Sequence, residues 1–438
     1  MTDVLRVVDA RTLPWCDPLS VAAGLRGRDG ALALLSDGGP LGRWSWVGAD
    51  PDQTYVGPVE DAAPFARLRQ TPFANGVVGL MSYDAGARPA TGARAEVWPD
   101  LMLARYPALL RFDHQQQSVQ AIGRGVDAAA ARAAADTAGD WLRSGVESGS
   151  PPAPAAGFRA ETTDQTYRDA VADVIGRIAA GELFQANIAR AWTGELVPGA
   201  DPFDVMVRLA ESRASAYGAF WRLGDRALVS NSPELFLTLD AANRRIETRP
   251  IKGTRPRDPD PVRDAALVTQ LEASAKDRAE NLMIVDLMRN DLARTARPGS
   301  VRVERLFEVE THPTVHHLVS TVSGEARVDL GPADLLEASF PPGSITGAPK
   351  HQAMKVIAAH EPPRGPWCGS LFMIDDSGDL TASVLIRTAG FVRRDGIWSY
   401  RTLAGAGIVA DSDPEAELQE TTAKIRAMRE ALTGDQLV

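Results

Sequence analysis

The chain has 438 residues, 44% of them hydrophobic and 24% charged, the composition of a globular protein with one large core or with two domains. The formal net charge of -10 argues against a nucleic-acid partner and against an anionic membrane surface. No apolar run approaches the roughly 20 residues of a membrane helix, and the N-terminus lacks a signal-peptide pattern. The two cysteines, Cys16 and Cys368, provide neither a disulfide framework nor a thiolate metal cluster. We therefore expect a cytoplasmic protein without nucleic-acid or membrane partners.

The first third of the chain combines short strands with one Ala-rich helix. Strand-like runs are expected at residues 31–35, 43–47, 76–83 and 108–112, and the helix at residues 128–142. A Ser/Gly/Pro-rich segment begins at Ser144, and this composition is typical of a linker. We therefore divide the chain into an N-terminal subdomain (1–143), a linker (144–160) and a larger domain (161–438).

After the linker, helices alternate with strands. The spacing of Tyr167, Val171, Val174 and Ile178 predicts a helix over residues 167–180. Strands are expected at residues 228–229, 235–239, 301–303, 319–322, 380–386 and 397–403. Antiparallel strands separated by turns, with helices packed outside them, indicate an α+β fold.

Lys252 stands in the segment RPIKGTRPR, between Pro250 and Gly253. Pro and Gly mark the end of a strand, so we expect the amine beside a cleft. An ordinary lysine loses its proton at pH 7 at a cost of roughly 4.6 kcal/mol, so a nucleophilic amine would need burial or neighbouring cations. A basic strip that faces solvent or a phosphate is the alternative interpretation. Candidate cations are three arginines of the same segment: Arg249, Arg255 and Arg257.

Two helical stretches carry carboxylates at spacings of three and four. The first, residues 276–291, contains Asp277, Glu280 and Asp291, and the second contains Glu417, Glu420 and Lys424. Carboxylates from two helices, without a cluster of Cys or His, would suit magnesium. A solvated helix with an ordinary Glu420–Lys424 ion pair explains the second stretch equally well.

Two glycine-containing segments are candidates for ligand contact. In FPPGSITGAPK, Thr346 is a candidate helix cap, and the helix start could attract a carboxylate, although a tight loop that merely begins a helix is the alternative. Gly405 and Gly407 form a GxG between strands that lacks the third glycine of a dinucleotide loop. We expect these glycines to let a ligand approach the backbone.

Three single residues are further candidates. Glu234 begins an apolar strand, where burial could raise the pKa of its carboxyl and make it an acid; the alternative is an exposed strand-end charge. His317 is either a catalytic or orienting imidazole or a hydrogen-bonded core residue. Arg387 could bind a carboxylate with its guanidinium or pair with an acidic neighbour.

Taken together and in order, these segments resemble the chorismate-binding domain of the chorismate-utilising enzymes, which include anthranilate synthase, aminodeoxychorismate synthase, isochorismate synthase and salicylate synthase. The resemblance runs from about residue 167 to residue 428, about three-fifths of the chain. LGRWSWVGADP and GVVGLMSYDAG are similar to the small N-terminal subdomain of the anthranilate synthase component I type. The matching stretches are GELFQANIAR, SNSPELFL, PIKGTRPR, KDRAENLMIVDLMRNDL, HHLVSTVSG, FPPGSITGAPK, RGPWCGS, SVLIRT and AGAGIVADSDPEAELQET.

The resemblance implies a core of two packed, mainly antiparallel sheets flanked by helices, with magnesium and chorismate between them. PIKGT resembles the aminodeoxychorismate synthase pattern, whereas anthranilate synthases usually have alanine at position 252. It implies that the Lys252 amine attacks C2 of chorismate, that ammonia enters at C4, and that the product serves 4-aminobenzoate and folate synthesis. Gln185 occupies a position that is lysine in the water-using branches, which favours an ammonia-using member. Anthranilate synthase component I and a non-catalytic paralogue are the alternatives.

The resemblance also implies roles for individual residues. Glu280 and Glu420 would hold magnesium with Asp277 and Glu417 close behind, Glu234 would protonate the departing hydroxyl, and His317 would line the ring site. Trp367 stands where the family often has tyrosine, and Phe372 where glycine is usual. The remaining substrate contacts would be Gly253, Thr254, Thr346, Gly405 and Lys424 at the ring or its carboxylate, and Trp367 and Arg387 at the enolpyruvyl carboxylate.

Ammonia must come from elsewhere. Neither Cys16 nor Cys368 lies in a nucleophile-elbow pattern, and no glutaminase module can be recognised in the sequence. We therefore expect a separate glutamine amidotransferase subunit to supply the ammonia.

Overall fold

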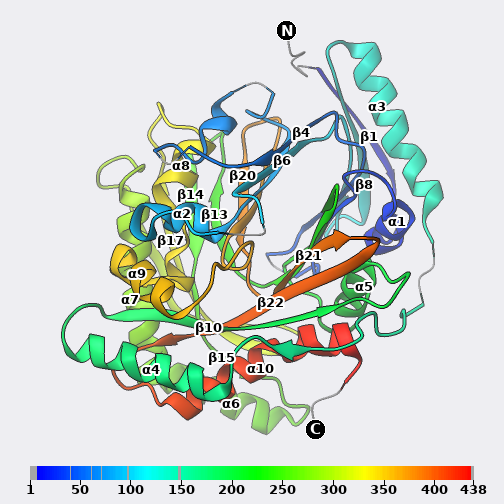
Figure 1. Cartoon of the computed structure of the whole chain (residues 1–438). Coiled ribbons are helices and arrows are strands. Elements are labelled where there is room, and N and C mark those ends of the chain that lie inside the picture. Colours follow the sequence, from blue (N-terminus) through cyan, green and yellow to red (C-terminus); the bar gives the residue numbers. More distant parts are fainter. Residues whose placement is uncertain are drawn as a thin grey trace.

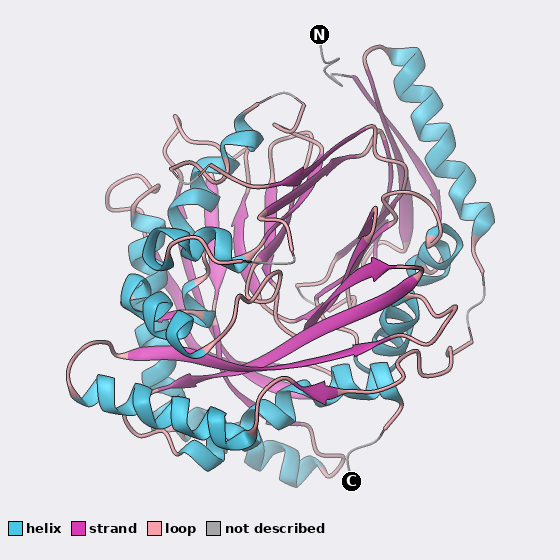
Figure 2. Ribbon diagram, viewed as in Figure 1, coloured by secondary structure: helices cyan, strands magenta, loops and turns pink. Residues whose placement is uncertain are grey.

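The computed structural model describes residues 7–39, 41–60, 62–70, 72–95, 98–146 and 149–435. Two large sheets form its centre, and helices cover their outer faces (Figures 1 and 2). All pairings between the described strands are antiparallel. The predicted α+β fold, with two mainly antiparallel sheets flanked by helices, is confirmed.

The larger sheet has 12 strands within the described residues. β9 (Arg159–Ala160) pairs with β10 beside the main path. The order along that path is β1 (Val7–Pro14), β8 (Ser118–Gly125), β7 (Ala108–Asp113), β3 (Trp44–Gly48), β2 (Leu32–Leu35), β11 (Tyr217–Leu223), β12 (Arg226–Ser232), β21 (Thr388–Arg394), β22 (Ile397–Ile408), β10 (Gln185–Glu195) and β18 (Gly347–Ala348).

The smaller sheet has 10 strands in the same described part of the chain. β16 (Arg302–Thr311) pairs with β17 beside the main path. The order is β15 (Ile251–Pro256), β17 (Val315–Glu325), β14 (Arg245–Arg249), β13 (Leu235–Leu239), β20 (Leu380–Val384), β19 (Ser370–Ile374), β5 (Val77–Met81), β6 (Leu101–Arg105) and β4 (Gln53–Gly57).

The helices begin at recognisable caps. Thr163, Ser274 and Asp413 accept hydrogen bonds from backbone N–H groups in the first turns of α4, α7 and α10. No helix of the described residues is long and apolar enough to cross a membrane. The helices are α1 (Pro18–Leu25), α2 (Tyr83–Thr91), α3 (Ala128–Trp141), α4 (Asp164–Ala179), α5 (Pro202–Arg213), α6 (Pro261–Ala273), α7 (Ala275–Ala293), α8 (Pro332–Ser339), α9 (Lys350–His360) and α10 (Pro414–Thr433), with short 3-10 turns η1 (Ala66–Arg69), η2 (Leu142–Ser144) and η3 (Gly343–Ile345).

Strands from the N-terminal part continue both sheets. Leu35 of β2 pairs with Gly218 of β11, and Met81 of β5 pairs with Ser370 of β19. The predicted domain boundaries at residues 143 and 161 therefore stay predictions from the sequence. In the structure, strands from the two parts are hydrogen-bonded to each other in both sheets. Residues 1–6, 40, 61, 71, 96–97, 147–148 and 436–438 of the predicted ranges lie outside the described residues.

Phe372, at the position where the resemblance implies glycine, is part of the hydrophobic core that includes residues of the smaller sheet, α7 and α8. Its side chain is 1% exposed, and its ring packs edge-on against Phe65 with centroids 6.1 Å apart. A Cβ added at Gly79, on the neighbouring strand β5, would lie 2.3 Å from the Phe372 ring. The missing side chain at Gly79 therefore makes room for the extra ring.

Candidate active site

Two glycines of β22, beside its neighbouring strand β10, leave a surface that is free of side chains. The GxG lies inside β22, so the prediction of a link between strands is wrong, and Gly407 pairs with Asn187 of β10. A Cβ added at Gly407 would lie 2.4 Å from Gln185 Nε2 and 3.6 Å from Lys252 Nζ. One added at Gly405 would lie 2.4 Å from Asn187 Oδ1 and 3.0 Å from the Trp367 ring. We call Gly405 and Gly407 the glycine floor, because their missing side chains leave space among polar groups.

Four polar side-chain atoms around the glycine floor have no hydrogen-bond partner within the described ranges. Gln185, Asn187 and Trp367 are 0%, 6% and 4% exposed, yet both polar atoms of Gln185, Oδ1 of Asn187 and Nε1 of Trp367 have no partner among the described residues. Burying a polar group without a hydrogen bond costs about 1–3 kcal/mol, so their convergence marks a site for a polar ligand. The sequence analysis missed Asn187. Its place two residues after Gln185, on the same face of a strand, was the available signal.

Lys252 reaches this site from the smaller sheet. It follows the end of β14 and is the second residue of β15, as expected for an amine beside a strand end. Nζ donates a 2.9 Å hydrogen bond to the carbonyl oxygen of Ser344 in η3. The next residue, Gly253, has a φ of 87° and no room for a side chain, since a Cβ would lie 2.9 Å from Asp277 Cγ. Glycine is therefore required directly after the lysine.

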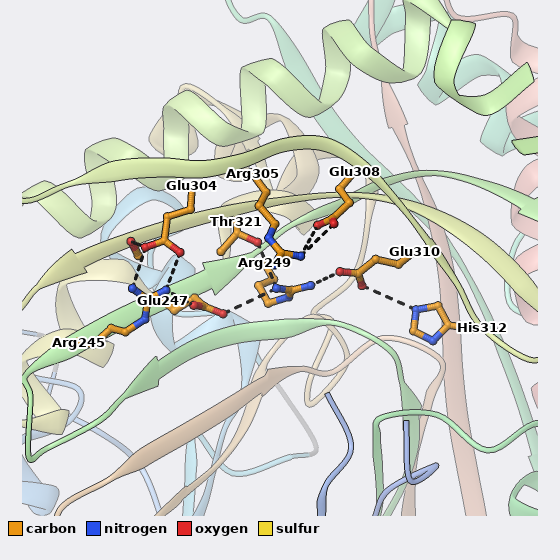
Figure 3. Close-up of polar contacts among 10 residues, drawn as sticks. Arg245, Glu247, Arg249, Glu304, Arg305, Glu308, Glu310, His312 and Thr321 are labelled. Atoms are coloured by element: carbon orange, nitrogen blue, oxygen red, sulfur yellow. Dashed lines mark hydrogen bonds and ion pairs between the residues drawn. The ribbon is translucent and has the colours of Figure 1, made fainter. Parts of the chain in front are cut away.

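The three arginines of the lysine segment are each paired with a carboxylate. Arg249 lies between Glu247 and Glu310 and donates to Thr321 Oγ1 at 3.1 Å (Figure 3). Arg255 and Arg257 bind Asp277 at 3.1 Å and Asp264 at 2.9 Å, respectively. Each of these candidate cations therefore has a carboxylate partner of its own, which weakens the electrostatic effect that it can exert on Lys252.

Glu234 is a buried carboxyl beside the lysine. It is 4% exposed, which rules out the exposed strand-end alternative. Burial raises its pKa, while interactions with Ser344, Lys252 and the backbone of Ile251 oppose that shift. Ser344 therefore interacts with both Glu234 and Lys252. A carboxyl in such surroundings keeps its proton to higher pH and can act as an acid.

His317 is a buried residue of β17, and its ring is neutral. Burial, followed by the charge of Arg387, lowers its pKa to about 3. Its Nδ1 lies 2.8 Å from Oγ1 of Thr254, which is an exposed residue. Arg387, the residue directly before β21, has a φ of 51°. The imidazole can accept or donate a hydrogen bond, but it carries no charge near neutral pH.

The two carboxylate helices, α7 and α10, approach each other at the site. Burial raises the pKa of Glu280, and the charges of Glu420 and Asp277 act in the same direction. Lys276 Nζ lies 3.9 Å from Glu280 and 3.5 Å from Glu417. Burial also acts to raise the pKa of Glu420, but Lys424 and Lys276 outweigh it, so that this pKa is lowered.

The other acidic residues have partners of their own. Asp277 binds Arg255, and Glu417 is 2% exposed and accepts from Ser412 Oγ at 2.7 Å. Asp291 binds Lys350 at 2.8 Å and lies outside the group. Lys424 forms the expected ion pair with Glu420 at 2.6 Å, but it also donates to the Gly405 carbonyl at 3.0 Å. This second contact turns Lys424 toward the glycine floor.

The donor chemistry of Glu280 and Glu420 fits magnesium. Among the described residues, no group of three or more His, Cys, Asp or Glu could hold a metal by itself. Magnesium commonly uses one or two protein carboxylates and takes its other ligands from water and substrate. Glu280 and Glu420 are close enough that the charge of Glu420 raises the pKa of Glu280. The two carboxylates are therefore a suitable but incomplete set of magnesium ligands.

The loop before α9 contributes backbone rather than a helix cap. Thr346 is 0% exposed and donates to the Pro342 carbonyl at 2.8 Å, and α9 begins only at Lys350. The prediction of Thr346 as the cap is wrong, because β18 and Pro349, which is the residue at the N-cap position, separate Thr346 from α9. The loop instead supplies Ser344.

Comparison with known proteins gives the family. The profile for chorismate binding enzyme matches residues 48–430. Aminodeoxychorismate synthase component 1 of Escherichia coli (strain K12) is 40% identical over 369 residues, which cover 82% of this chain and 78% of that protein. Anthranilate synthase component 1 of Streptomyces coelicolor is 35% identical in an alignment of 452 positions, which covers 95% of this chain and 86% of that protein.

Solved structures agree with this result. Anthranilate synthase component I from Streptococcus pneumoniae TIGR4 aligns with a TM-score of 0.76 at 26% identity, over 88% of this chain and 92% of that one. The menaquinone-specific isochorismate synthase of Escherichia coli shares the fold, with a TM-score of 0.75 at 20% identity over 98% and 95%. The chain belongs to the family of chorismate binding enzymes.

Proposed function

We propose that this chain is a chorismate-aminating enzyme that acts as component I of an aminodeoxychorismate synthase and forms 4-amino-4-deoxychorismate. The observation that carries the proposal is Lys252, whose amine is held by Ser344 and faces the glycine floor beside Gln185. A relative of that name is 40% identical. In the resemblance, lysine at this position is the feature that separates 4-amination from 2-amination.

The lysine would act as the nucleophile. Its amine forms a bond to C2 of chorismate as the C4–O bond breaks and the ring double bonds shift. Glu234 gives its proton to the departing hydroxyl, which leaves as water. Ammonia then bonds to C4 as the bond between C2 and the lysine nitrogen breaks, which returns the free amine. The new C4 ammonium group releases one proton, which restores the acid form of Glu234.

Other residues would hold the substrate. Glu280 and Glu420 would bind magnesium, which neutralises the ring carboxylate when present. Arg387 and Trp367 would hold the enolpyruvyl carboxylate. Since Nε1 of Trp367 is buried and has no hydrogen-bond partner in the described part of the chain, its N–H can replace the hydroxyl of the usual tyrosine. Gly253, Thr254, Thr346, Gly405 and Lys424 would surround the ring, and His317 would line it.

A separate glutamine amidotransferase subunit would supply ammonia in the cytoplasm. The relatives named component 1 support this division of labour. The purified chain should accordingly use ammonium salts directly and use glutamine only when that subunit is added.

Anthranilate synthase component I is the second candidate, since a relative of that name is 35% identical over most of the chain. The two activities separate in one assay with chorismate, magnesium and ammonium. We expect 4-aminobenzoate to form only after an aminodeoxychorismate lyase is added. Direct formation of anthranilate would overturn the proposal, and no turnover would indicate a non-catalytic paralogue.

A further inference from the structure

The edge of β10 beside the active site is only partly covered by strands. β18 pairs with Gln185 and Ala186 at one end, and β9 pairs with Trp192 and Thr193 at the other. Among the described residues, no strand pairs with this edge between residues 187 and 191. The Asn187 N–H and the Ala191 carbonyl bind loop backbone at Thr346 and Glu161 instead. The Asn187 carbonyl and the Ala189 N–H require other partners.

Two charged side chains take the place of the missing strand. Arg364 Nη2 donates to the Asn187 carbonyl at 2.6 Å, and Glu361 Oε1 accepts from the Ala189 N–H at 2.7 Å. The guanidinium and the carboxylate bind each other through two hydrogen bonds of 2.8 and 2.9 Å. Arg364 is 1% exposed and Glu361 is 6% exposed. The pair therefore continues the hydrogen bonding of β10 from inside the protein.

The guanidinium also contacts two other parts of the site. Nη1 donates to the Ile345 carbonyl at 3.2 Å, one residue after Ser344. The guanidinium carbon lies 5.0 Å from the centre of the Trp367 ring, a distance typical of a cation–π contact. One buried cation thus touches the strand of Gln185 and Asn187, the turn that holds Lys252, and Trp367.

Stability alone is a weak reason for such an arrangement. Burying two charges carries a desolvation cost that their attraction often fails to exceed, and well-packed neutral replacements are frequently as stable. Positioning explains the geometry better, since Arg364 joins the Asn187 carbonyl of β10 to the Ile345 carbonyl of η3. It does so beside the direct bond from the Asn187 N–H to the Thr346 carbonyl.

We propose that Arg364, held by Glu361, is a positioning residue that sets Lys252 and its Ser344 carbonyl against the floor formed by β10 and β22. The expected effect on kcat rests on the proposed function. The expected effect on the position of Lys252 rests on the contacts alone. Both consequences can be measured separately.

The test uses Arg364→Met and the double variant Arg364→Met/Glu361→Gln. The single variant leaves Glu361 buried without its cation and should lose stability, whereas the neutral double variant should recover much of it. In the double variant we expect kcat to fall about 10²-fold, with the KM for chorismate within about 3-fold of the parent value. Arg401→Met is the matched control, because Arg401 binds Glu161 and the Pro363 carbonyl on the outer side of the same segment.

A second measurement is independent of the reaction. The rate at which an amine-reactive reagent labels Lys252, followed by mass spectrometry, should change at least about 3-fold in the double variant, while the exposed Lys355 keeps its rate. If the parent protein does not aminate chorismate, the proposed function fails, but the labelling result still judges the positioning role. Parent-like kcat or parent-like labelling in a folded double variant would overturn the inference. Failure of the double variant to fold would assign the pair to stability and overturn it too.

Discussion

The side-chain nitrogen of Lys252 and the carbonyl oxygen of Ser344 are 2.9 Å apart, although the two residues are 92 positions apart in the chain. Ser344 also interacts with Glu234. Lys252, the proposed nucleophile, and Glu234, the proposed acid, therefore both contact one turn, η3, which belongs to a different part of the chain. A change in that turn would move both groups together.

Lys252→Ala should abolish 4-amination, because no other amine can form the bond to C2 from that position. Direct attack of ammonia at C2 then becomes the available reaction, so the residual product should shift toward anthranilate. Chromatography of the products with and without the lyase measures this. Lys355→Ala, on the exposed face of α9, is the control. Unchanged 4-amination by Lys252→Ala would remove the lysine from the mechanism.

Glu234→Gln should lower kcat by about 10²- to 10⁴-fold, the usual worth of a positioned general acid. The rate of the parent enzyme should decline as pH rises through the raised pKa of this carboxyl. A parent-like rate for the glutamine variant would show that the departing hydroxyl takes its proton from elsewhere.

The same substitution has a stability consequence with a definite sign. Because burial raises the pKa of Glu234, the native state keeps a proton that the unfolded state releases above about pH 4.3. That contribution is complete below this pH and is lost as pH rises through the raised pKa. Denaturant unfolding between pH 4 and 8 should therefore show the parent losing stability relative to Glu234→Gln.

The sequence predicted the elements of the site better than their contacts. Residue spacing identified the helices that became α7 and α10, and apolar runs identified ten strands of the 12-stranded and 10-stranded sheets. The GxG was misplaced between strands, since two glycines in a strand read as a turn until their neighbours are known. Position 407 is a glycine within a strand, because Gln185 and Lys252 occupy the space next to where its side chain would lie.

Contacts between distant segments could not be predicted from local patterns. The arginines around Lys252 read as a cationic cluster, but Asp264, Asp277 and Glu310 neutralise them from other elements. Arg364 was part of a recognised segment, yet its role depends on Asn187 and Ile345, far away in sequence. Tertiary pairing, which a single sequence does not display, decides both cases.

Magnesium should stabilise the folded protein through Glu280 and Glu420. A ligand at 100 times its dissociation constant adds about 2.7 kcal/mol, so the Tm of the parent should rise with magnesium concentration. Glu280→Gln should remove most of that rise. Without metal, its Tm should equal or exceed that of the parent, because a buried carboxyl with a raised pKa is replaced. Glu272→Gln, at an exposed site on α6, should respond like the parent, and an undiminished rise in Glu280→Gln would exclude this site.

His317 should remain neutral throughout the working pH range. Its pKa of about 3 follows first from burial, so the native ring stays unprotonated while the unfolded one binds a proton below about pH 6.5. The resulting stability is complete above that pH and is lost as pH falls toward 3. Nitrogen-labelled NMR between pH 5 and 8 should show a fixed ring signal for His317, with the exposed His351 for comparison. A ring that titrates in that window would contradict the assignment.

Gly407→Ala should block the site while leaving the fold intact. The new methyl group would lie 2.4 Å from Gln185 Nε2 and 3.6 Å from Lys252 Nζ, so it must displace the amide and fill the space above the floor. We expect a KM for chorismate at least about 10-fold higher, or loss of measurable turnover, since a methyl group in a fitted pocket is worth about 1–3 kcal/mol. Gly176→Ala, in α4 with nothing within 4 Å of the added carbon, should instead stabilise the protein by about 0.5–1 kcal/mol without affecting turnover. Steady-state kinetics and denaturant unfolding of the two variants separate these effects, and parent-like kinetics for Gly407→Ala would show that substrate does not reach the glycine floor.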